Sequence, residues 1–522
     1  MRPLVSPSEK LANSLEILTA LQKRGVVAVR SADLTRIHRE RLVKNGFLQE
    51  VMKGWYIPVR PDQAAGESTA WYASFWDFCS AYLQERFGNN WCLSPEQSLL
   101  LHAGNRTVPH QLLVRSPKAR NRITTLPHNT SLLDTRAALP ASEHVVEKEG
   151  IKIFSICAGL ASCGSVFFRQ NATDARAALA MIRDSSDVLS LLLQGGRTTI
   201  AGRLAGAFRN VGRDRIAEDI VNTMRSAGYD VRESDPFEDT PSFILPKQGQ
   251  SPYMNRIRLM WQEMREPVLR NFPAAPGPPS DIAGYLKAAD DIYLSDAYHS
   301  LSIEGYRVSP RLIERVRSGD WDPDENEDDR EQRNALAARG YWQAYQVVRE
   351  SVRKVLKGDN PGTVGDDDHR EWYREMFGPS VTAGLLRPAD LAGYRSEPVY
   401  IRRSMHVPPR SEAVRDCMPL FFDLLRKEPE AAVRVVLGHF VLVYIHPYMD
   451  GNGRMGRFLM NVMHAAGGYP WTVIPLAKRD DYMYALEIAS VQQEIMPFAT
   501  FLGDLVSGHL EGKPLPRVPG ME

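Results

Sequence analysis

Two apolar stripes separated by a glycine-rich loop are the feature that most constrains the fold of this chain. Across 433–444, apolar residues step by 3, 1, 3, 1 and 3 positions, the spacing of one helix face. The same spacing returns across 455–463, and two glycines at 467–468 follow. Pro447 disfavours helical backbone at the residue before it, so the first helix is expected to stop at His446. The sequence therefore predicts two buried helices joined by a loop that begins with a histidine.

The loop Asp450-Gly451-Asn452-Gly453 and the two arginines after it are residue types that bind phosphate. Glycines let backbone N–H groups approach an anion, and the helix N-terminus that follows favours negative charge. Arg454 and Arg457 lie at i, i+3, so both can point at one oligophosphate. Asp450 offers an oxygen ligand for phosphate-bound Mg²⁺, and His446 can take a proton from an attacking hydroxyl. These parts suit transfer of a phosphoryl or nucleotidyl group to a hydroxyl.

The stretch HPYMDGNGRMGR resembles the Fic-family signature H-P-F-x-D/E-G-N-G-R-x-x-R, with Tyr448 where Phe is usual. Members of that family move AMP from ATP to a Ser, Thr or Tyr hydroxyl of a target protein. The resemblance implies that His446 is the catalytic base and that Asp450 is the Mg²⁺ ligand. A later stretch, RDDYMYALEIAS, is similar to the family's adenine-side helix. The ATP-binding residues implied in this way are Asp450, Gly451, Asn452, Gly453, Arg454, Met455, Gly456, Arg457, Tyr482 and Met483.

The resemblance also divides the phosphates of ATP among the loop and the two arginines. Residues 451–453 would form the anion hole. Arg454 would hold the inner phosphates, and Arg457 the γ-phosphate. The chain keeps the G-N-G-R core of the signature, which favours AMP transfer over other substrates.

Residues 394–409, YRSEPVYIRRSMHVPP, are similar to the family's β-hairpin flap, which aligns a segment of the target protein. Backbone pairing to such an edge strand would hold a side-chain hydroxyl near His446 with little sequence preference. The edge strand is expected at Val399, Tyr400, Ile401 and Arg402.

The stretch SLSIEG resembles the family's inhibitory motif, S/T-x-x-x-E-G/N. Ser300 and Glu304 lie at i, i+4, on one face of a helix. Glu304 is expected to pair with Arg457 and so to occupy the cation that a γ-phosphate needs. The resemblance implies a resting state that is autoinhibited from within the chain.

The first 60 residues are locally basic, with eleven Lys/Arg against five Asp/Glu. The sequence predicts a helix at 11–21, helix caps at Ser31 and Thr35, and a hairpin turn at Lys53-Gly54, with Ile37 and Leu42 facing a core. This order is typical of a winged helix-turn-helix, and it weakly resembles that part of AbiEi-type antitoxins. An RNA- or protein-binding winged helix and a plain solvated face are left open as well. The expected DNA contacts are Arg36, Arg39, Arg41 and Lys53.

The whole chain is expected to be mainly α-helical and to contain several domains. Its 522 residues carry 43% apolar and 24% charged residues with a net charge of +1, which excludes a disordered chain and a global nucleic-acid-binding field. Five cysteines without a CxxC pair and the lack of a long apolar run favour a cytoplasmic, non-membrane protein. The expected parts are a winged helix at 1–60, an α+β region at 61–240, a linker with one helix at 241–280, and a Fic domain at 281–522 with an inhibitory helix at 295–305 and a core at 380–510.

The sequence favours the function of a protein adenylyltransferase, with ATP and Mg²⁺ as cofactors. The partner is a hydroxyl-bearing target protein, for which the chain itself is one candidate, and a homodimer is left open. Removal of AMP, with Glu304 positioning a water, is a second possible reaction at the same site. An inactive Fic scaffold and a DNA-binding regulator or antitoxin whose Fic domain senses nucleotide are two further hypotheses. Gly451, Gly453 and Gly456 also match a G-x-G-x-x-G dinucleotide loop, but the helical stripe before them argues against it.

Overall fold

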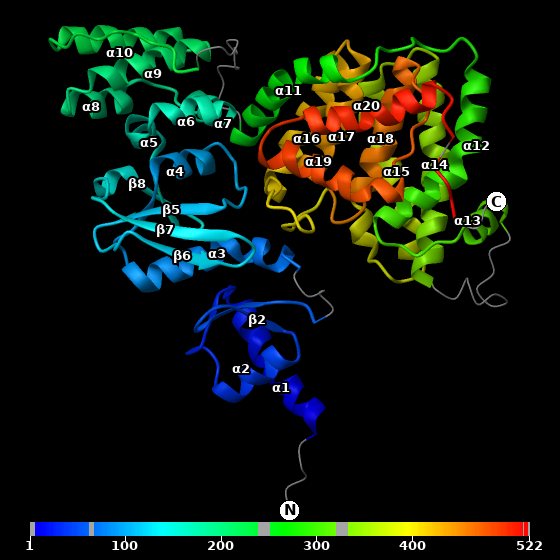
Figure 1. The fold of residues 1–522 in the computed structure, drawn as a ribbon, viewed down its shortest axis with the longest axis horizontal. Coiled ribbons are helices and arrows are strands. Elements are labelled where there is room, and N and C mark those ends of the chain that lie inside the picture. The colour runs from blue at the N-terminus through cyan, green and yellow to red at the C-terminus, as the bar shows by residue number, and fades with distance from the viewer. Residues whose placement is uncertain (1–5, 62–66, 238–250, 320–331, 515, 520–522) are drawn as a thin grey trace, which may run out of the picture. The chain divides into compact units, whose positions relative to one another are not determined.

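The computed structural model describes residues 6–61, 67–237, 251–319, 332–514 and 516–519. The chain divides into two compact units, which are described separately (Figure 1). Unit 1 comprises residues 1–256 with 400–407, and unit 2 comprises residues 257–399 with 408–522. The acidic stretch at 320–329 lies outside the described residues. No helix among the described residues is both long and apolar enough to span a membrane.

Unit 1 begins with a small helix-and-sheet motif. Its helices are α1 (Pro7–Lys23) and α2 (Arg36–Lys44), and Thr35 caps α2 by accepting a hydrogen bond from the His38 N–H. Strands β1 (Val29–Arg30), β2 (Leu48–Met52) and β3 (Trp55–Pro58) form an antiparallel sheet in the order β1-β3-β2. The turn between β2 and β3 falls on Lys53-Gly54, as predicted. Leucines from both helices and from β2 close a small core.

Two local predictions in this motif are wrong. Ser31 does not cap a helix, because residues 31–34 form only a turn. Ile37 is 66% exposed, whereas Leu42 is fully buried. Five positions separate these two residues, which places them about 140° apart around a helix, so one face cannot hold both.

The expected DNA contacts of this motif are partly engaged within the protein. Arg36 pairs with Glu40 on the exposed side of α2. Arg39 donates to the Ser31 carbonyl, and Arg41 donates to the Lys10 carbonyl and to the Ser14 hydroxyl. Lys53 is exposed at the hairpin turn.

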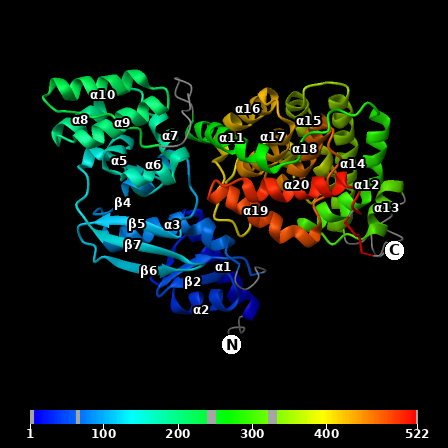
Figure 2. The same ribbon diagram turned by 45° about the horizontal axis from the view of Figure 1, so that its top comes forward.

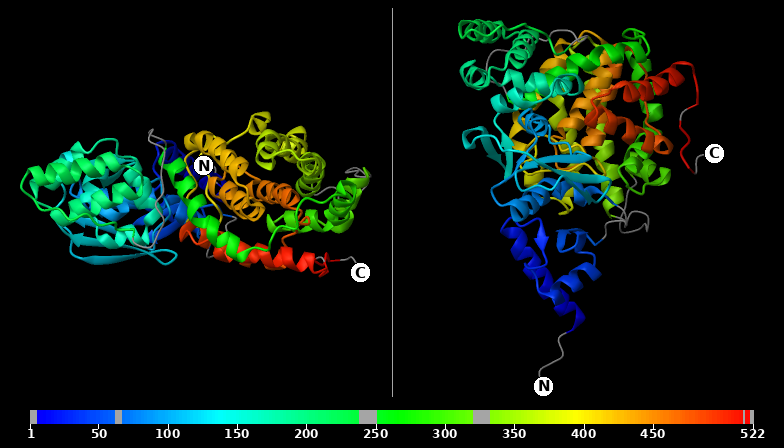
Figure 3. Two further views of the ribbon diagram at one scale, coloured as in Figure 1. Left: turned by 90° about the horizontal axis from the view of Figure 1, so that it is seen from above. Right: turned by 60° about the vertical axis from the view of Figure 1, so that its left-hand side comes forward.

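The rest of unit 1 is an α+β region, in line with the expectation for 61–240. Its four-stranded sheet has the order β4-β5-β7-β6, in which β5 and β7 are parallel and the other pairs are antiparallel, while β8 and β9 form a separate antiparallel pair. The cyan strands can be followed in both views of Figure 3. The elements up to this point are α3 (Thr69–Phe87), β4 (Cys92–Leu93), α4 (Pro95–His102), β5 (Gln111–Ser116), β6 (Arg122–Leu126), β7 (Thr130–Arg136), β8 (Val145–Lys148) and β9 (Ile151–Phe154).

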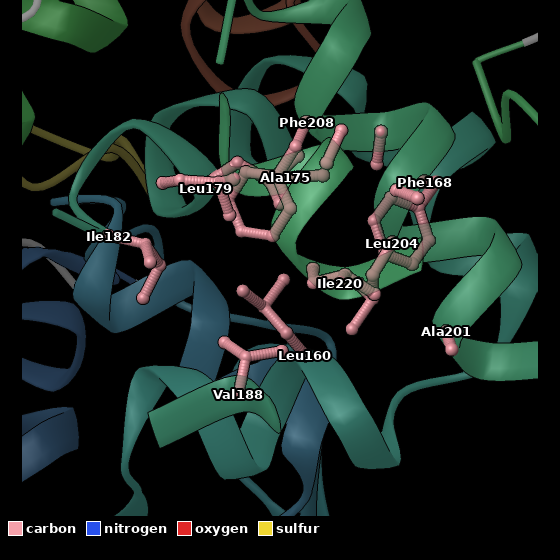
Figure 4. Close-up of a cluster of buried hydrophobic side chains, with 14 of the residues drawn as sticks. Leu160, Phe168, Ala175, Leu179, Ile182, Val188, Ala201, Leu204, Phe208 and Ile220 are labelled. Atoms are coloured by element: carbon pink, nitrogen blue, oxygen red, sulfur yellow. The ribbon is translucent and has the colours of Figure 1, made fainter. Parts of the chain in front are cut away.

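A cluster of short helices follows β9 and has its own hydrophobic core (Figure 4). Leu160, Phe168, Leu179, Leu204 and Phe208 come from several of these helices and are almost completely buried. Burial of such side chains contributes about 1.5–3 kcal/mol each, which holds these short helices together. The helices are α5 (Ile156–Ser162), α6 (Ser165–Gln170), α7 (Ala172–Ala180), α8 (Ser186–Gln194), α9 (Thr198–Asn210) and α10 (Asp214–Ser226).

The regular elements of unit 2 in its described residues are all helices. Its centre is the predicted helix pair, α17 (Ala431–Ile445) and α18 (Asn452–Gly467), which run side by side among the neighbouring helices (Figure 2). Almost every residue of this pair is buried, as the two apolar stripes predict. The surrounding helices are α11 (Pro252–Asn271), α12 (Ile282–Ile303), α13 (Pro310–Ser318), α14 (Gln332–Leu356), α15 (Pro361–Thr382), α16 (Ser411–Lys427), α19 (Arg479–Val491) and α20 (Met496–Leu510).

Helix α11 lies in the segment expected to be a linker, yet most of it is a packed part of unit 2. Trp261 donates its indole N–H to Glu428, and Arg265 pairs with the same carboxylate at 3.1 Å. Glu428 is itself only 6% exposed. A buried carboxylate with two donors from α11 fixes this helix against the end of α16.

The expected β-hairpin flap at 394–409 is not formed, because this segment contains no strand. Proline at 398, 408 and 409 removes N–H donors that a ladder needs. Its tip, 400–407, belongs to unit 1, where Arg402 pairs with buried Glu67 at 2.9 Å and the Arg403 N–H donates to Thr69. Val399, Tyr400, Ile401 and Arg402 are therefore extended loop, and not an edge strand.

Candidate active site

The joint between α17 and α18 sets the shape of the site. The chain leaves α17 at His446 in the left-handed conformation, with φ 53° and ψ 60°, and enters α18 through Gly451 at φ 81°. Asn452 braces the loop, because its amide accepts from the Tyr448 N–H and donates to the Tyr448 carbonyl, both at 2.9 Å. The expected helix stop before Pro447 is therefore found. The side-chain amide of Asn452 is used in these two hydrogen bonds within the loop. A contact between Asn452 and an anion would therefore come from its backbone N–H.

The imidazole of His446 has the tautomer that a base requires. Its Nδ1 lies 3.1 Å from the Val443 carbonyl, which can only accept, so Nδ1 carries the proton and Nε2 is left as the basic atom. Burial lowers the pKa of His446 to about 4, and the charge of Arg395 acts in the same direction, while Glu304 and Asp450 oppose it. The ring is therefore neutral and able to accept a proton at physiological pH.

The predicted pair between Glu304, of the stretch SLSIEG, and Arg457 is formed. Arg457 is 3% exposed and its Nη2 lies 2.7 Å from Glu304 Oε1. The same guanidinium donates to the hydroxyl of Ser300 at 2.9 Å and to its carbonyl at 3.0 Å. The two residues of the stretch thus bind one guanidinium from the last turn of α12.

Glu304 is ionised despite its surroundings. Burial raises its pKa, but the charges of Arg457 and Arg454 and the hydrogen bond from Arg457 outweigh burial and hold the pKa below the ordinary value. The carboxylate reaches this place only because residue 453 is glycine, since a Cβ there would lie 2.3 Å from Glu304 Oε1. The glycine loop and the glutamate are therefore matched in shape as well as in charge.

Arg454 lies beside the pair and is 1% exposed. Its guanidinium stands over the rings of Tyr306 and Phe377, about 5 Å from each centroid, and reaches Asp450 at 3.3 Å. Asp450 is 65% exposed and also accepts from the Gly451 N–H. Two buried cations and one open carboxylate thus line the start of α18.

Two buried donor atoms at this site test whether a polyphosphate fits. Nε of Arg454 and Nη1 of Arg457 make no hydrogen bond with any described residue. An unpaired buried donor is costly, so an anion that meets both atoms would be favoured. For a metal the support is narrower: in the described residues no group of three acidic, histidine or cysteine side chains stands together, so Asp450 would need phosphate oxygens to complete a Mg²⁺ shell.

Behind Arg457 runs a chain of hydrogen bonds that the sequence did not reveal. Tyr341 donates to Asp296 at 2.6 Å, and the Ser300 hydroxyl contacts Tyr341. Asp296 is 3% exposed, and burial raises its pKa to about 6. The donors run from Arg457 through Ser300 and Tyr341 to Asp296. The only hint in the sequence is that Asp296 lies one helical turn before Ser300.

The remaining residues expected to bind ATP, at 455, 456, 482 and 483, differ in how they are packed. Met455 is fully buried in the core, and a Cβ on Gly456 would touch His439, so these residues serve the packing of α18 on α17. Tyr482 is 1% exposed and its hydroxyl lies 2.8 Å from His439 Nε2, so its ring offers no open face to adenine. Met483 is partly exposed on α19. Spacing in the sequence does not show how α19 is rotated about its axis. The side chains of α19 that face an adenine could therefore not be assigned from the sequence.

A histidine with a basic Nε2, two buried guanidiniums and a glycine loop at the start of a helix are the features expected of a site that binds phosphate. Residues 366–464 match the model of the Fic/DOC family, and the chain carries a Fic/DOC domain in its C-terminal half. The matched residues begin within α15 and end within α18, and they include the whole loop described above.

Curated relatives agree with this assignment. The chain is 28% identical over 229 residues to protein adenylyltransferase Fic of Drosophila willistoni, covering 43% of this chain and 42% of that protein. It is 30% identical over 226 residues to protein adenylyltransferase Fic of Nematostella vectensis, covering 41% and 47%. The chain thus spans less than half the length of these relatives. Among solved structures, Fic-1 (aa134 - 508) from C. elegans is similar at a TM-score of 0.37 and 17% identity, over 67% of this chain and 97% of that one.

We expect Tyr341→Phe to destabilise unit 2, because it removes the 2.6 Å hydrogen bond to the buried Asp296. The free energy of unfolding, measured by urea titration, should fall by about 1–3 kcal/mol. Tyr345→Phe is the matched control, since Asp290 keeps both hydrogen bonds from Arg349. Equal losses of unfolding free energy in the two variants would show that the hydrogen bonds behind Arg457 do not stabilise unit 2 more than the control hydrogen bond does.

Proposed function

We propose that the chain is a protein adenylyltransferase, which transfers AMP from ATP to a Ser, Thr or Tyr hydroxyl of a target protein. One observation carries the proposal. The basic Nε2 of His446 lies where the loop begins, and α18, which follows the loop, carries two buried guanidiniums that each keep a donor without a hydrogen bond to a described residue. The printed names of the curated relatives and the matched Fic/DOC model support the same activity.

In the proposed reaction the target oxygen attacks the α-phosphorus of ATP. A new O–P bond forms, the bond from the α-phosphorus to the bridging oxygen breaks, and pyrophosphate leaves. The proton of the attacking hydroxyl goes to Nε2 of His446. Arg454 and Arg457 stabilise the charge on the leaving phosphates, together with the N–H groups at the start of α18.

Mg²⁺ fits this site through Asp450, whose carboxylate is exposed beside the two arginines. A bound Mg²⁺ would neutralise phosphate charge and orient the leaving group. Asp450→Asn should therefore slow transfer at least about tenfold and raise the Mg²⁺ concentration that gives half-maximal rate. A titration of the rate against Mg²⁺ measures both effects. An unchanged curve would remove Asp450 as the metal ligand.

We further propose that Glu304 inhibits the enzyme. What supports this is the ion pair with Arg457, the guanidinium assigned to the γ-phosphate. While this ion pair is formed, Arg457 is not available to a γ-phosphate, and the negative charge of Glu304 repels the phosphate. ATP would then sit without its α-phosphorus in line with the target oxygen.

Glu304→Gly should raise AMP transfer at least about tenfold, because it frees a cation worth several kcal/mol to a phosphate. The measurement is incorporation of α-labelled ATP into the chain itself or into proteins of a lysate. Adding His446→Ala to this variant should abolish the signal, since the proton acceptor is gone.

The matched control is Glu494→Gly, which removes an exposed loop carboxylate and should leave transfer unchanged. No gain from Glu304→Gly would reject the inhibitor. If the wild-type chain instead releases AMP from an already modified protein, the site works in the direction of removal.

The low pKa of His446 makes a distinct prediction for the pH dependence. An ordinary histidine with a pKa near 6.5 is only about one-tenth unprotonated at pH 5.5. With a pKa of about 4, the base stays competent there, and activity is lost only as pH falls further. Glu304 carries a charge that raises the pKa of His446, so its removal should lower this pKa further. The kcat/KM of Glu304→Gly should therefore be nearly flat between pH 7 and pH 5.5, and a tenfold drop over that range would contradict the assignment.

DNA binding by the N-terminal motif is a separate proposal. What supports it is the local excess of basic residues and the 81% exposed side chain of Arg36 on α2. Arg36→Glu with Lys53→Glu should then weaken retention of duplex DNA by the full chain and flatten its salt dependence. If the amount of DNA retained depends neither on salt nor on these substitutions, DNA binding by the motif is rejected and a protein-docking role is left.

A further inference from the structure

Arg395 is a buried arginine that joins two parts of unit 2. It is 2% exposed and lies near the start of the segment that is similar to a target-binding flap. Its Nε donates to the His446 carbonyl at 2.8 Å, and its Nη2 donates to the Pro409 carbonyl and reaches that of Ile445 at 3.4 Å. On the flap side its Nη1 donates to the Glu397 carbonyl at 3.2 Å. One guanidinium thus binds the end of α17 and both flanks of the flap tip.

The end of α17 is a place where such a cation is favoured. The last carbonyls of a helix have no partner within the helix and carry partial negative charge. Ile445 and His446 provide two of these carbonyls, and the backbone N–H of Arg395 adds a bond to the Pro447 carbonyl at 2.9 Å. The contacts therefore fall on the turn where the chain reverses after α17.

This support matters because His446 is held in an unfavourable backbone conformation. A residue with a Cβ costs about 1–2 kcal/mol in the left-handed region. His446 lies there at φ 53°, and this conformation sets the direction in which its ring leaves the helix end. Without a partner for its carbonyl, the turn would be free to relax and to move Nε2.

We propose that Arg395 is a positioning residue for the base, coupling the flap segment to the orientation of His446. The proposal rests on the proposed adenylyl transfer, in which His446 accepts the proton of the target hydroxyl. A target bound along the flap would reach a base whose backbone is tied to that same segment. In this proposal Arg395 contacts neither ATP nor the target, and it acts on the base through these carbonyls and through its charge.

The pKa of His446 is a measurable quantity that a purely structural role of Arg395 would not change. The charged groups that act on the imidazole are Arg395, which favours the neutral ring, and Glu304 and Asp450, which favour the protonated ring. Removing the positive charge at 395 should therefore raise the pKa of His446. Lysine would keep the charge but cannot reach carbonyls on both sides with one planar group.

The test uses the full chain carrying Glu304→Gly, with Arg395→Met and Arg395→Lys added separately. Arg387→Met is the control, because that nearby arginine is 80% exposed and pairs only locally with Asp390. We expect both Arg395 variants to lose at least about tenfold in transfer rate while binding a fluorescent ATP analogue within about twofold of the parent. The acidic limb of the pH profile should move up by about half a pH unit or more in Arg395→Met, and less in Arg395→Lys.

NMR titration of His446 in histidine-labelled protein tests the role of Arg395 even if the Glu304→Gly protein transfers no AMP. An upward pKa shift in Arg395→Met and a smaller one in Arg395→Lys would support the coupling, and the failure would then lie with the proposed function. The proposal is overturned if the pKa and the transfer rate match those of Arg387→Met. It is also overturned if ATP binding, rate and melting temperature fall together, which would mark a residue needed only for folding.

Discussion

The buried guanidinium of Arg457 is the constraint on which the rest of the site depends. Burying an ion costs several kcal/mol unless counter-charges and hydrogen bonds compensate for it. Glu304 supplies the direct counter-charge, and Ser300 leads through Tyr341 to a second carboxylate at Asp296. Because the Ser300 hydroxyl and carbonyl bind the same guanidinium, Arg457 would keep partners if Glu304 moved away. A site with Glu304 as the sole partner would be destabilised whenever Glu304 moved away.

The parts of this arrangement that follow from local spacing could be predicted from the sequence. Apolar residues at helical spacing indicate the two buried helices, and Pro447 indicates where the first one ends. Ser300 and Glu304, at i, i+4, had to lie on one side of a helix. Such features depend on the geometry of one element, so the order of residues determines them. The likeness of the motif to a known family then linked two stretches that are far apart in the chain.

The rest depends on contacts that no local pattern carries. Arg395 looks like any arginine of a polar loop, and its importance appears only when α17 and the flap segment meet. Tyr341 is 45 positions from Asp296, and nothing in either stretch indicates the other. The flap was expected as a hairpin because the likeness to a family says nothing of prolines that remove ladder donors or of a tip bound by Glu67. Side-chain contacts between distant segments override local preference in each case.

The position of Glu304 would allow the proposed exchange of the ion pair for a ligand. Ser300 lies inside the last turn of α12 and is 2% exposed, whereas Glu304 is the capping residue, with a side chain that is 26% exposed. Gly305 follows in the left-handed conformation and ends the helix, and the Tyr306 N–H donates back to the Leu301 carbonyl. Rotating the glutamate away therefore breaks one carboxylate contact and leaves the Ser300 contacts to Arg457 in place. Helix ends open at lower free energy than helix interiors, so the proposed inhibitor, placed at the cap, could leave without unfolding the helix that carries it.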